Sequence, residues 1–443
     1  MTQSPTDHSP SQRPHIVVVG GGMVGIATAI WSLREGCRVT LIDKGRAEDR
    51  ASFGNAGVLA SASVLPVTMP GLIGKIPKLV LSPTEPIFLR WAYLARLMPW
   101  ALRYLSHATL SEAQRIARAL IPIVGNSLEN HLALTDGAKA RRHINPCDFA
   151  VLYQDRAAFR KDAHAWDIRK GLGFEWTEYD GAARRRYDPI FTDNLGFVAT
   201  LSGHGQITDP GAYVKDLHAH FEEAGGVILN REVTGILQQD GHITAVQTLE
   251  GAVTADRVAI TAGAWSPLLT KKLGVKIPAE AESGYHLEFW DPSFLPRVPT
   301  LVSRKKMIFS PMKGRLRVAG AVEFGGLKNQ GQDKVFDLLK SVVTEVLPGF
   351  TYSKETRWFG HRPAPTDSVP IIDELPSVKG VFLGFGHQHV GLTGSARTGQ
   401  ILAQLMNDKR PNIDLSPYSA RRFTGVALNM RPQSTSAQKK GSV

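Results

Sequence analysis

The sequence has little cysteine and no long uninterrupted apolar segment. Only two of its 443 residues are cysteine, Cys37 and Cys147, too few for an iron–sulfur cluster or a cysteine-ligated zinc site. So low a number also favours a reducing compartment. No charge-free apolar run approaches the roughly 20 residues that a membrane-spanning helix needs. The N-terminal sequence MTQSPTDHSPSQRPH lacks the apolar core of a signal peptide. We therefore expect a cytoplasmic protein without a transmembrane helix.

The patterns of several reaction types are also missing. The chain shows no Ser-His-Asp arrangement, no histidine cluster at metal-ligand spacing and no lysine-bearing phosphate loop. We therefore expect no metal site. Lysine and arginine outnumber aspartate and glutamate by 52 to 40, a net charge of +12, which favours anionic partners such as phosphorylated cofactors and carboxylate substrates. This surplus is spread along the chain and forms no basic stripe with stacking aromatics, so we expect no nucleic-acid partner.

A glycine-rich turn between an apolar strand and a helix stands near the N-terminus. Residues 17–29 read VVVGGGMVGIATA, and the glycines match the pattern G-x-G-x-x-G as Gly20, Gly22 and Gly25. The first allows a tight turn, the second leaves room for a pyrophosphate at the helix N-terminus, and the third lets the helix pack closely on the strand. Asp43 ends the next strand, where its carboxylate can accept both hydroxyls of a ribose. The order of strand, glycine turn, helix and second strand, with an acid at the end of that strand, predicts dinucleotide binding.

The rest of the chain favours a flavin over a nicotinamide dinucleotide. No second fingerprint of this kind appears, which is typical of an enzyme whose bound flavin is reduced directly by its substrate. The stretch SFGNAG at 52–57 offers small residues and backbone donors that can approach a flavin ring. A second stretch, VAITAGAWS at 258–266, predicts a strand that ends in a turn beside the nucleotide.

Several motifs in fixed order now make the whole pattern recognisable. With GHGQITDPGAYV at 203–214, WFGHRPAPTDSVPII at 358–372 and GFGHQHVGLTGSARTGQILAQL at 384–404, the chain resembles the FAD-dependent D-amino-acid oxidase superfamily. Within it, the chain is most similar to the bacterial D-amino-acid dehydrogenases, from about residue 15 to 425. The resemblance implies a two-domain α/β fold. A glutathione-reductase-like FAD-binding Rossmann domain would be interleaved with a substrate domain whose antiparallel sheet covers the flavin.

The resemblance also implies domain limits and cofactor contacts. We expect the FAD-binding domain to comprise residues 15–64, 203–280 and 356–425, and the substrate or cap domain residues 65–202 and 281–355. Residues 1–14 and 426–443 are expected to be disordered. No histidine or cysteine stands in a flavin-linking context, so we expect FAD to be bound non-covalently. The expected FAD contacts are Gly20, Gly22, Met23, Val24, Gly25, Asp43, Lys44, Ser52, Asn55, Ala56, Gly57, Val233, Ala262, Gly263, Gly386, Gly391, Leu392 and Thr393.

Four residues acquire catalytic roles from the resemblance. Arg362, in GHRP, matches the arginine that pairs with the substrate carboxylate, whose two oxygens a planar guanidinium can bind. Tyr285 resembles a tyrosine whose hydroxyl helps to bind the substrate carboxylate. The alternative is that it is a tyrosine in the core of a sheet. His387 and His389 precede a helix whose backbone at 391–393 can donate to negative charge on the reduced flavin, with structural histidines as the alternative. His389 stands where glycine oxidases carry an arginine, which argues against glycine or sarcosine as the substrate.

The implied activity is oxidation of a D-amino acid, with hydride to flavin N5 and electrons passed to a quinone or another carrier. The GHQH segment and an apolar cap suggest a small or cyclic substrate such as D-proline or a hydroxyproline epimer. Residues 87–105 form a basic amphipathic pattern with an aromatic face, expected either to cover the substrate cavity or to contact the inner face of the cytoplasmic membrane. The alternatives are a glycine or sarcosine oxidase using O2, an RNA-modifying flavoprotein, and a flavin-binding protein without catalysis.

Overall fold

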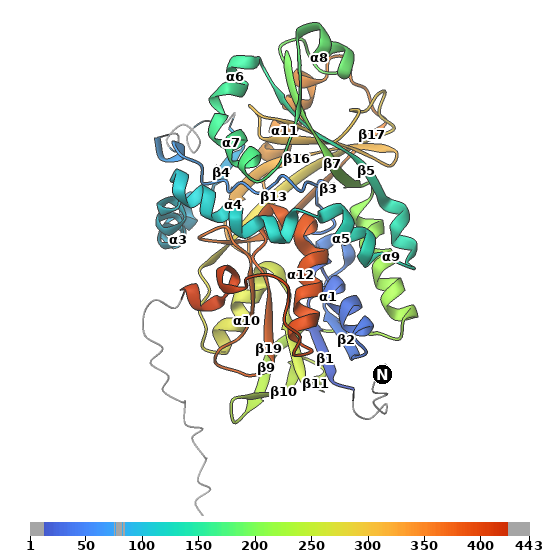
Figure 1. The fold of residues 1–443 in the computed structure, drawn as a ribbon, viewed down its shortest axis with the longest axis vertical. Helices are drawn as coiled ribbons and strands as arrows, with labels where there is room; N and C mark the ends of the chain where they lie inside the picture. Colours follow the sequence, from blue (N-terminus) through green and yellow to red (C-terminus); the bar gives the residue numbers. More distant parts are fainter. Residues whose placement is uncertain (1–12, 75, 77–81, 83–84, 424–443) are drawn as a thin grey trace, which may run out of the picture.

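The computed structural model describes residues 13–74, 76, 82 and 85–423. The segments expected to be disordered, 1–14 and 426–443, lie outside these residues except for 13 and 14. Two β-sheets organise the described chain, one above the other along the long axis of the molecule (Figure 1). The fold is therefore mixed α/β with two sheet-based units, as the sequence predicts.

The first sheet has six strands and is almost entirely parallel. Its strand order is β18 (Ile371–Glu374), β19 (Val381–Phe385), β12 (Arg257–Ile260), β1 (His15–Val19), β2 (Arg38–Asp43) and β8 (Val227–Asn230). Only β18 runs antiparallel to its neighbour in this sheet. Every residue of β1 is buried, which explains its continuous apolar sequence, because a parallel strand covered on both faces has no solvent side. A smaller three-stranded sheet lies beside it, in the order β11 (Gly251–Thr254), β10 (His242–Thr248) and β9 (Val233–Gln239).

Two helices far apart in sequence pack side by side on the first sheet. They are α1 (Met23–Arg34) and α12 (Gly391–Leu405), blue and red at the centre of Figure 1. A Cβ at Gly399 of α12 would lie 2.6 Å from the carbonyl carbon of Ala27 in α1, so the helices approach more closely than a side chain would allow. This contact places the N-termini of both helices at the same edge of the sheet.

The second sheet has ten strands. Eight follow one path, in the order β17 (Lys354–Pro365), β13 (Ala279–Trp290), β16 (Arg315–Phe324), β15 (Met307–Met312), β14 (Thr300–Val302), β5 (Ile144–Tyr153), β7 (Phe197–Ile207) and β3 (Val58–Leu59). The other two, β4 (Ile87–Leu89) and β6 (Thr177–Asp180), pair with β16 and β7. The sheet was expected to be antiparallel, but β5 and β4 run parallel to β14 and β16. Both parallel pairs join segments separated by more than a hundred residues, which local patterning does not reveal.

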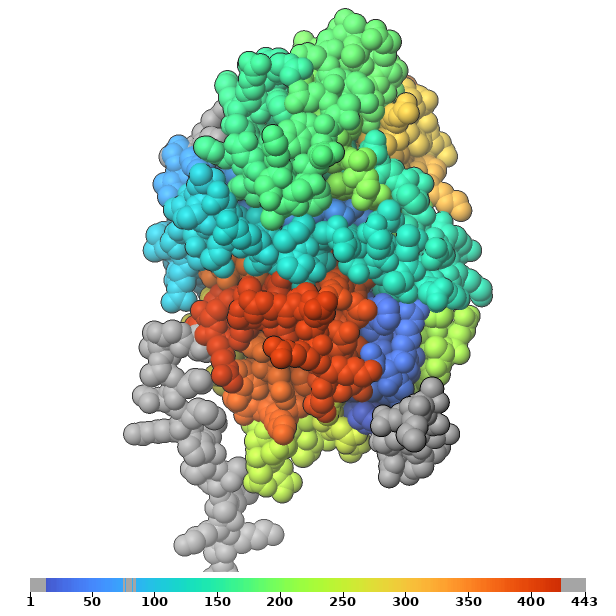
Figure 2. Space-filling view, in the orientation of Figure 1, coloured from blue at the N-terminus to red at the C-terminus, as the bar shows by residue number. Residues whose placement is uncertain are grey.

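Helices cover the second sheet and bridge the two units. Those around it are α6 (Arg156–Lys161), α7 (Ala163–Gly171), α8 (Gly181–Tyr187) and α11 (Asp333–Val346), while α9 (Pro210–Glu223) and α10 (Ser266–Lys272) lie beside the first unit. The helix α4 (Leu110–Val124) crosses the molecule between the two units as the cyan band of Figure 2. It and α5 (Ser127–Leu134) pack on α12, although the sequence assigns them to the cap domain. The domain limits drawn from the sequence stay a prediction.

The segment 87–105 comprises β4, a short turn and all but the last residue of α3 (Leu94–Ser106). One face of α3 packs inward, and Trp100 donates its indole N–H to the carbonyl of Ala364 at 2.8 Å. The other face is exposed, with Leu102 at 62%. Within the described residues, no helix combines the length and apolar character needed to cross a membrane.

Candidate active site

The glycine turn after β1 brings backbone segments closer together than side chains allow. Gly20 has a φ of +106°, and a Cβ there would lie 2.7 Å from the Cα of Ala262. A Cβ on Gly25 would lie 1.8 Å from the carbonyl oxygen of Gly20. Gly22 differs, because a Cβ there would meet only the hydroxyl oxygen of Ser52, at 3.4 Å. The fold itself therefore requires glycine at 20 and 25, whereas the space at Gly22 remains open to a ligand.

The N-terminus of α1 is available to an anionic group. Its first turn holds no acidic residue, and Gly22 supplies no side-chain cap. The Met23 N–H donates to the Ser52 hydroxyl at 2.9 Å. The other N–H groups of the first turn and the positive end of the helix dipole suit a pyrophosphate.

Asp43 lies at the end of β2, beside the glycine turn. One carboxylate oxygen accepts the N–H of Gly45 at 2.7 Å, and the other accepts the N–H of Gly21. Lys44 follows it and pairs with Glu232 at 2.8 Å on the surface. The carboxylate is thus fixed at the position where the sequence predicts a contact to a ribose.

A cavity of about 1470 Å³ runs from this turn to the N-terminus of α12. Most of the expected FAD contacts line it, namely Gly20, Gly22, Met23, Val24, Asp43, Lys44, Ser52, Asn55, Ala56, Val233, Ala262, Gly263, Gly391, Leu392 and Thr393. Gly25, Gly57 and Gly386 do not line it. A Cβ on Gly57 would lie 2.4 Å from the carbonyl oxygen of Ile207, so this glycine serves close packing behind the cavity wall. The residues that meet in the cavity fit a long dinucleotide with a pyrophosphate.

The opposite end of the cavity is formed by α12. Its first turn carries no acidic residue and no side-chain cap, so the N–H groups near Gly391 and Leu392 remain available to negative charge. Thr393 fixes the turn, because its hydroxyl donates to the carbonyl of Val58 at 3.1 Å. The segment 52–57, which we call the flavin loop, lines the same cavity through Ser52, Gly54, Asn55 and Ala56.

Arg362 faces the cavity from β17, beside a carboxylate that the sequence analysis missed. Its register partner across the strands is Glu282 of β13, and its Nη1 lies 3.1 Å from Oε1 of that residue. A Cβ on Gly284 would lie only 2.5 Å from Nη2 of Arg362, so this glycine makes room for the guanidinium. One Nη group is thus engaged by Glu282, and among the described residues the rest of the planar fork has no hydrogen-bond partner. Such a fork suits a carboxylate.

His387 and His389 both line the cavity, but in different ways. His387 is buried, its Nε2 lies 2.9 Å from the Thr398 hydroxyl, and burial lowers its pKa to about 4. It therefore ties the segment before α12 to the helix as a neutral imidazole. The His389 side chain is exposed to the cavity. The surrounding protein lowers its pKa, the charge of Arg362 lowers it further, and the charge of Glu282 raises it. Of the two histidines, His389 is thus the one close enough to Glu282 and Arg362 to interact with their charges.

Tyr285 does not reach the cavity, contrary to the expected role in carboxylate binding. Its side chain is completely buried, its ring packs edge-on against Phe336 and Phe359, and its hydroxyl donates to Glu323. Successive side chains of a strand point to opposite faces of the sheet, so Tyr285 lies on the face opposite Gly284. The alternative reading, a sheet-core tyrosine, agrees with this placement.

Buried neutral histidines give a prediction for stability against pH. Burial lowers the pKa values of His131, His218 and His387 to about 4, below the usual value of about 6.5. The unfolded chain therefore binds more protons between pH 6.5 and 4, and stability falls as the pH is lowered through this range. Each of the three histidines therefore makes the free energy of unfolding about 2 kcal/mol lower at pH 5 than at pH 7.5.

Urea unfolding of the protein at pH 7.5 and pH 5 measures this difference. We expect a clearly lower unfolding free energy at pH 5. Equal values at the two pH values would contradict neutral burial of these histidines.

Comparison with known proteins identifies the family. The model of the family described as "DAO: FAD dependent oxidoreductase" matches residues 15–405. A D-amino-acid oxidase of Bradyrhizobium diazoefficiens is 35% identical over 92% of this chain and 99% of its own length. A D-amino acid dehydrogenase of Rhizobium rhizogenes is 26% identical over the same shares.

Comparison with solved structures agrees on the fold. The glycine oxidase of Geobacillus kaustophilus superposes with a TM-score of 0.71 at 22% identity, over 93% of this chain and all of that one. The family match covers most of the chain, and the cavity has the glycine turn, Asp43 at the end of β2 and the two open helix N-termini, which fit the cofactor. The chain therefore belongs to the DAO family of FAD-dependent oxidoreductases, and FAD is its cofactor.

Proposed function

We propose that the protein oxidises a D-amino acid, with Arg362 holding the substrate carboxylate. The observation that carries this proposal is the guanidinium in the cavity wall, paired through one Nη with Glu282 and given space by Gly284. Relatives that match nearly the whole chain are a D-amino-acid oxidase and D-amino acid dehydrogenases.

The chain's own residues would bind and orient the substrate. Two charge-assisted hydrogen bonds from Arg362 fix the carboxylate, and so direct the α-carbon toward the cofactor. Glu282 holds the guanidinium in place from one side. His389 is held neutral, so a ring nitrogen can accept a proton from the substrate ammonium. The chemistry supplied by bound FAD is acceptance of the α-hydrogen as a hydride, which leaves an imino acid that water hydrolyses to an oxo acid and an amine or ammonia.

The cavity favours an apolar substrate side chain. Leu65, Met69, Leu72 and Ile87 contribute apolar surface to its lining. This composition supports an apolar substrate side chain. Among the small or cyclic D-amino acids that the sequence suggests, D-proline and a hydroxy-D-proline are the first compounds to test. Glycine and sarcosine would leave this surface without a partner.

The electron acceptor is proposed to be a quinone or another carrier that reaches the protein at a membrane surface. Trp91, Met98 and Leu102 expose 61%, 40% and 62% of their surface, and Arg96 lies exposed among them. Apolar side chains interspersed with arginine suit the headgroup region of an anionic bilayer. Sedimentation with anionic vesicles at low salt tests this surface. Wild-type protein should co-sediment and a Trp91→Ser/Leu102→Ser variant should not, whereas a wild-type protein that stays in the supernatant would contradict the proposal.

Anaerobic mixing of the FAD-loaded protein with D- and L-amino acids tests the activity itself. We expect a D-amino acid to bleach the oxidised flavin absorbance and its L-enantiomer to bleach it far more slowly. Subsequent addition of air or of a soluble quinone then distinguishes an oxidase, which forms peroxide rapidly, from a dehydrogenase. Flavin that dithionite reduces but no amino acid reduces would contradict the proposed function.

A further inference from the structure

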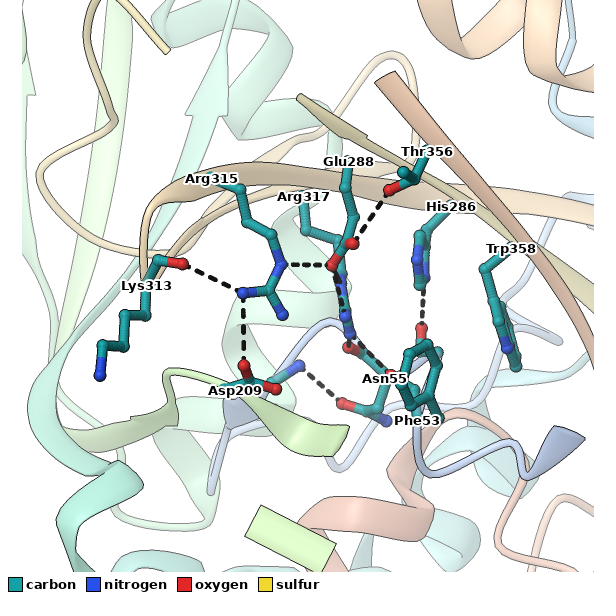
Figure 3. A network of polar contacts seen from close by, with 12 residues as sticks. Phe53, Asn55, Asp209, His286, Glu288, Lys313, Arg315, Arg317, Thr356 and Trp358 are labelled. Atoms are coloured by element: carbon teal, nitrogen blue, oxygen red, sulfur yellow. Dashed lines mark hydrogen bonds and ion pairs between the residues drawn. The ribbon is translucent and has the colours of Figure 1, made fainter. Parts of the chain in front are cut away.

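Two side chains of the second sheet that do not line the cavity, Arg317 and His286, hold the backbone of the flavin loop (Figure 3). Nη1 of Arg317 donates to the backbone carbonyl of Phe53 at 2.9 Å and also to that of Asn55. Nδ1 of His286 lies 3.0 Å from the carbonyl of Gly54 and must be the donor, because a carbonyl only accepts. Three consecutive carbonyls of the loop are therefore bound by side chains of β16 and β13.

This arrangement fixes the direction of two N–H groups. In a trans peptide the carbonyl of one residue and the N–H of the next point in opposite directions. The carbonyl of Phe53 shares its peptide with the N–H of Gly54, and the carbonyl of Asn55 shares its peptide with the N–H of Ala56. Gly54 and Ala56 both line the cavity, and in the described part of the chain neither N–H has an acceptor. With the carbonyls held behind the loop, these N–H groups are left for a ligand in the cavity.

A buried ion-pair network holds Arg317 in place. The Arg317 side chain is completely buried, and its Nη2 and Nε lie 2.6 and 3.0 Å from Oε1 of Glu288. The same oxygen accepts Nε of Arg315 at 2.6 Å, and Arg315 also bonds Asp209 at 3.3 Å. Burial alone would raise the pKa of Glu288, but Arg317 and Arg315 hold it at about 2. The carboxylate therefore stays charged at neutral and mildly acidic pH, so the network does not switch in that range.

Trp358 packs against the flavin loop beside His286. Its ring stacks on His286 with centroids 5.2 Å apart and an interplanar angle of 16°, and its indole N–H donates to the carbonyl of Glu48 at 2.7 Å. A Cβ on Gly54 would lie 2.1 Å from this ring, so the loop backbone rests directly against the tryptophan. The loop thus has little freedom to turn its peptides over.

The geometry points to Arg317 as a positioning residue for the cofactor, which orients the Phe53–Gly54 and Asn55–Ala56 peptides so that their N–H groups donate to the bound flavin. The positive charge next to both carbonyls polarises the same two peptides and strengthens their N–H groups as donors. Donors aimed at the flavin stabilise negative charge that develops there on reduction. Arg317 therefore raises both the affinity for FAD and the tendency of the flavin to be reduced, although it does not touch the substrate.

The test compares Arg317→Met with Arg315→Met, two substitutions in the same network. Arg317→Met releases the two carbonyls, and we expect FAD to bind at least tenfold more weakly and the flavin midpoint potential to become more negative. Arg315→Met also weakens the buried network, but leaves the bonds from Arg317 to the loop in place. It should lower the melting temperature while FAD affinity and midpoint potential stay close to wild type. Fluorescence titration of apoprotein with FAD and dye-coupled reduction measure both quantities.

His286→Phe provides a second variant in case Arg317→Met does not fold. It keeps the stacking on Trp358 and removes only the bond to the Gly54 carbonyl. The Gly54–Asn55 peptide offers no free N–H, because the Asn55 N–H donates to the Ser52 carbonyl, but it joins the two peptides that do. Releasing it loosens both neighbours, so the midpoint potential should shift in the same direction by a smaller amount. Unchanged affinity and potential in Arg317→Met would overturn the inference. The inference would also be overturned if Arg315→Met lowered FAD affinity and midpoint potential as much as Arg317→Met. General destabilisation of the network would then explain both changes.

Discussion

Replacement of Arg362 by methionine is expected to lower kcat/KM for the best D-amino acid by about 10²- to 10⁴-fold, since two charge-assisted hydrogen bonds of about 1.5 to 3 kcal/mol each are removed. Methionine preserves much of the side-chain length while it removes the charge. FAD affinity should not change, because Arg362 contacts the substrate end of the cavity. Steady-state kinetics and FAD titration of the purified variant measure the two effects separately.

Arg357→Met is the matched control for this variant. Arg357 lies on the same strand, but it pairs with Asp333 at 3.0 Å and with Glu355 at 3.3 Å on the surface. Its replacement should leave kcat/KM within about twofold of wild type, as expected for an exposed ion pair. A kcat/KM for Arg362→Met equal to that of the control would remove Arg362 from the substrate site.

In Arg362→Met, the unpaired Glu282 is expected to lower kcat/KM further. The Glu282 side chain is 9% exposed and would be left without its arginine partner, so its negative charge would repel the substrate carboxylate. The double variant Arg362→Met/Glu282→Gln should therefore be more active than Arg362→Met alone. This comparison separates the lost hydrogen bonds from the repulsion.

Gly22→Ala is expected to abolish tight FAD binding without disturbing the apoprotein. Gly22 has φ −71° and ψ −177°, which any residue adopts, and the new Cβ would meet only Ser52 Oγ at 3.4 Å. The methyl group instead occupies the space that we assign to the pyrophosphate at the N-terminus of α1. We expect an FAD Kd at least about 100-fold higher, corresponding to about 2.7 kcal/mol.

Gly235→Ala serves as the control for this substitution. A Cβ at Gly235, on β9, would have nothing within 4 Å, and this residue does not line the cavity. The apoprotein melting temperatures of both variants should match wild type, and only Gly22→Ala should lose FAD. Normal FAD content in Gly22→Ala would show that the pyrophosphate lies elsewhere.

The first βαβ unit could be predicted from the sequence, because its signals are local. The apolar strand, the glycine spacing and Asp43 all lie within 29 residues. The structure has a strand before the glycines, a helix after them and a second strand that ends at Asp43, as expected. Close packing explains why Gly20 and Gly25 are glycine, whereas Gly22 has no such packing role. A local pattern therefore predicted the fold of this unit, and the open space at Gly22 is the reason for assigning the pyrophosphate to it.

The substrate end of the cavity was harder to predict, because its parts come from separate strands. Arg362 lines the cavity as expected. Tyr285 is buried on the face of the sheet opposite Gly284, the residue that makes room for the Arg362 guanidinium. Strand alternation would have placed Glu282 and Gly284 on one face and Tyr285 on the other, and this signal was available in the sequence. The contacts of Arg317 with Phe53 and Asn55 span more than 260 residues, and no local pattern indicates them.

The central claim is that Arg362 orients the substrate through its carboxylate, and a single-turnover comparison tests it most directly. The FAD-loaded protein is mixed anaerobically with the best D-amino acid and, separately, with the corresponding amine that lacks the carboxylate, and the rate of flavin reduction is recorded. We predict that the amino acid reduces the flavin at least about 100-fold faster in the wild-type protein, and that this preference disappears in Arg362→Met. Equal rates for the two compounds in the wild-type protein would contradict the account.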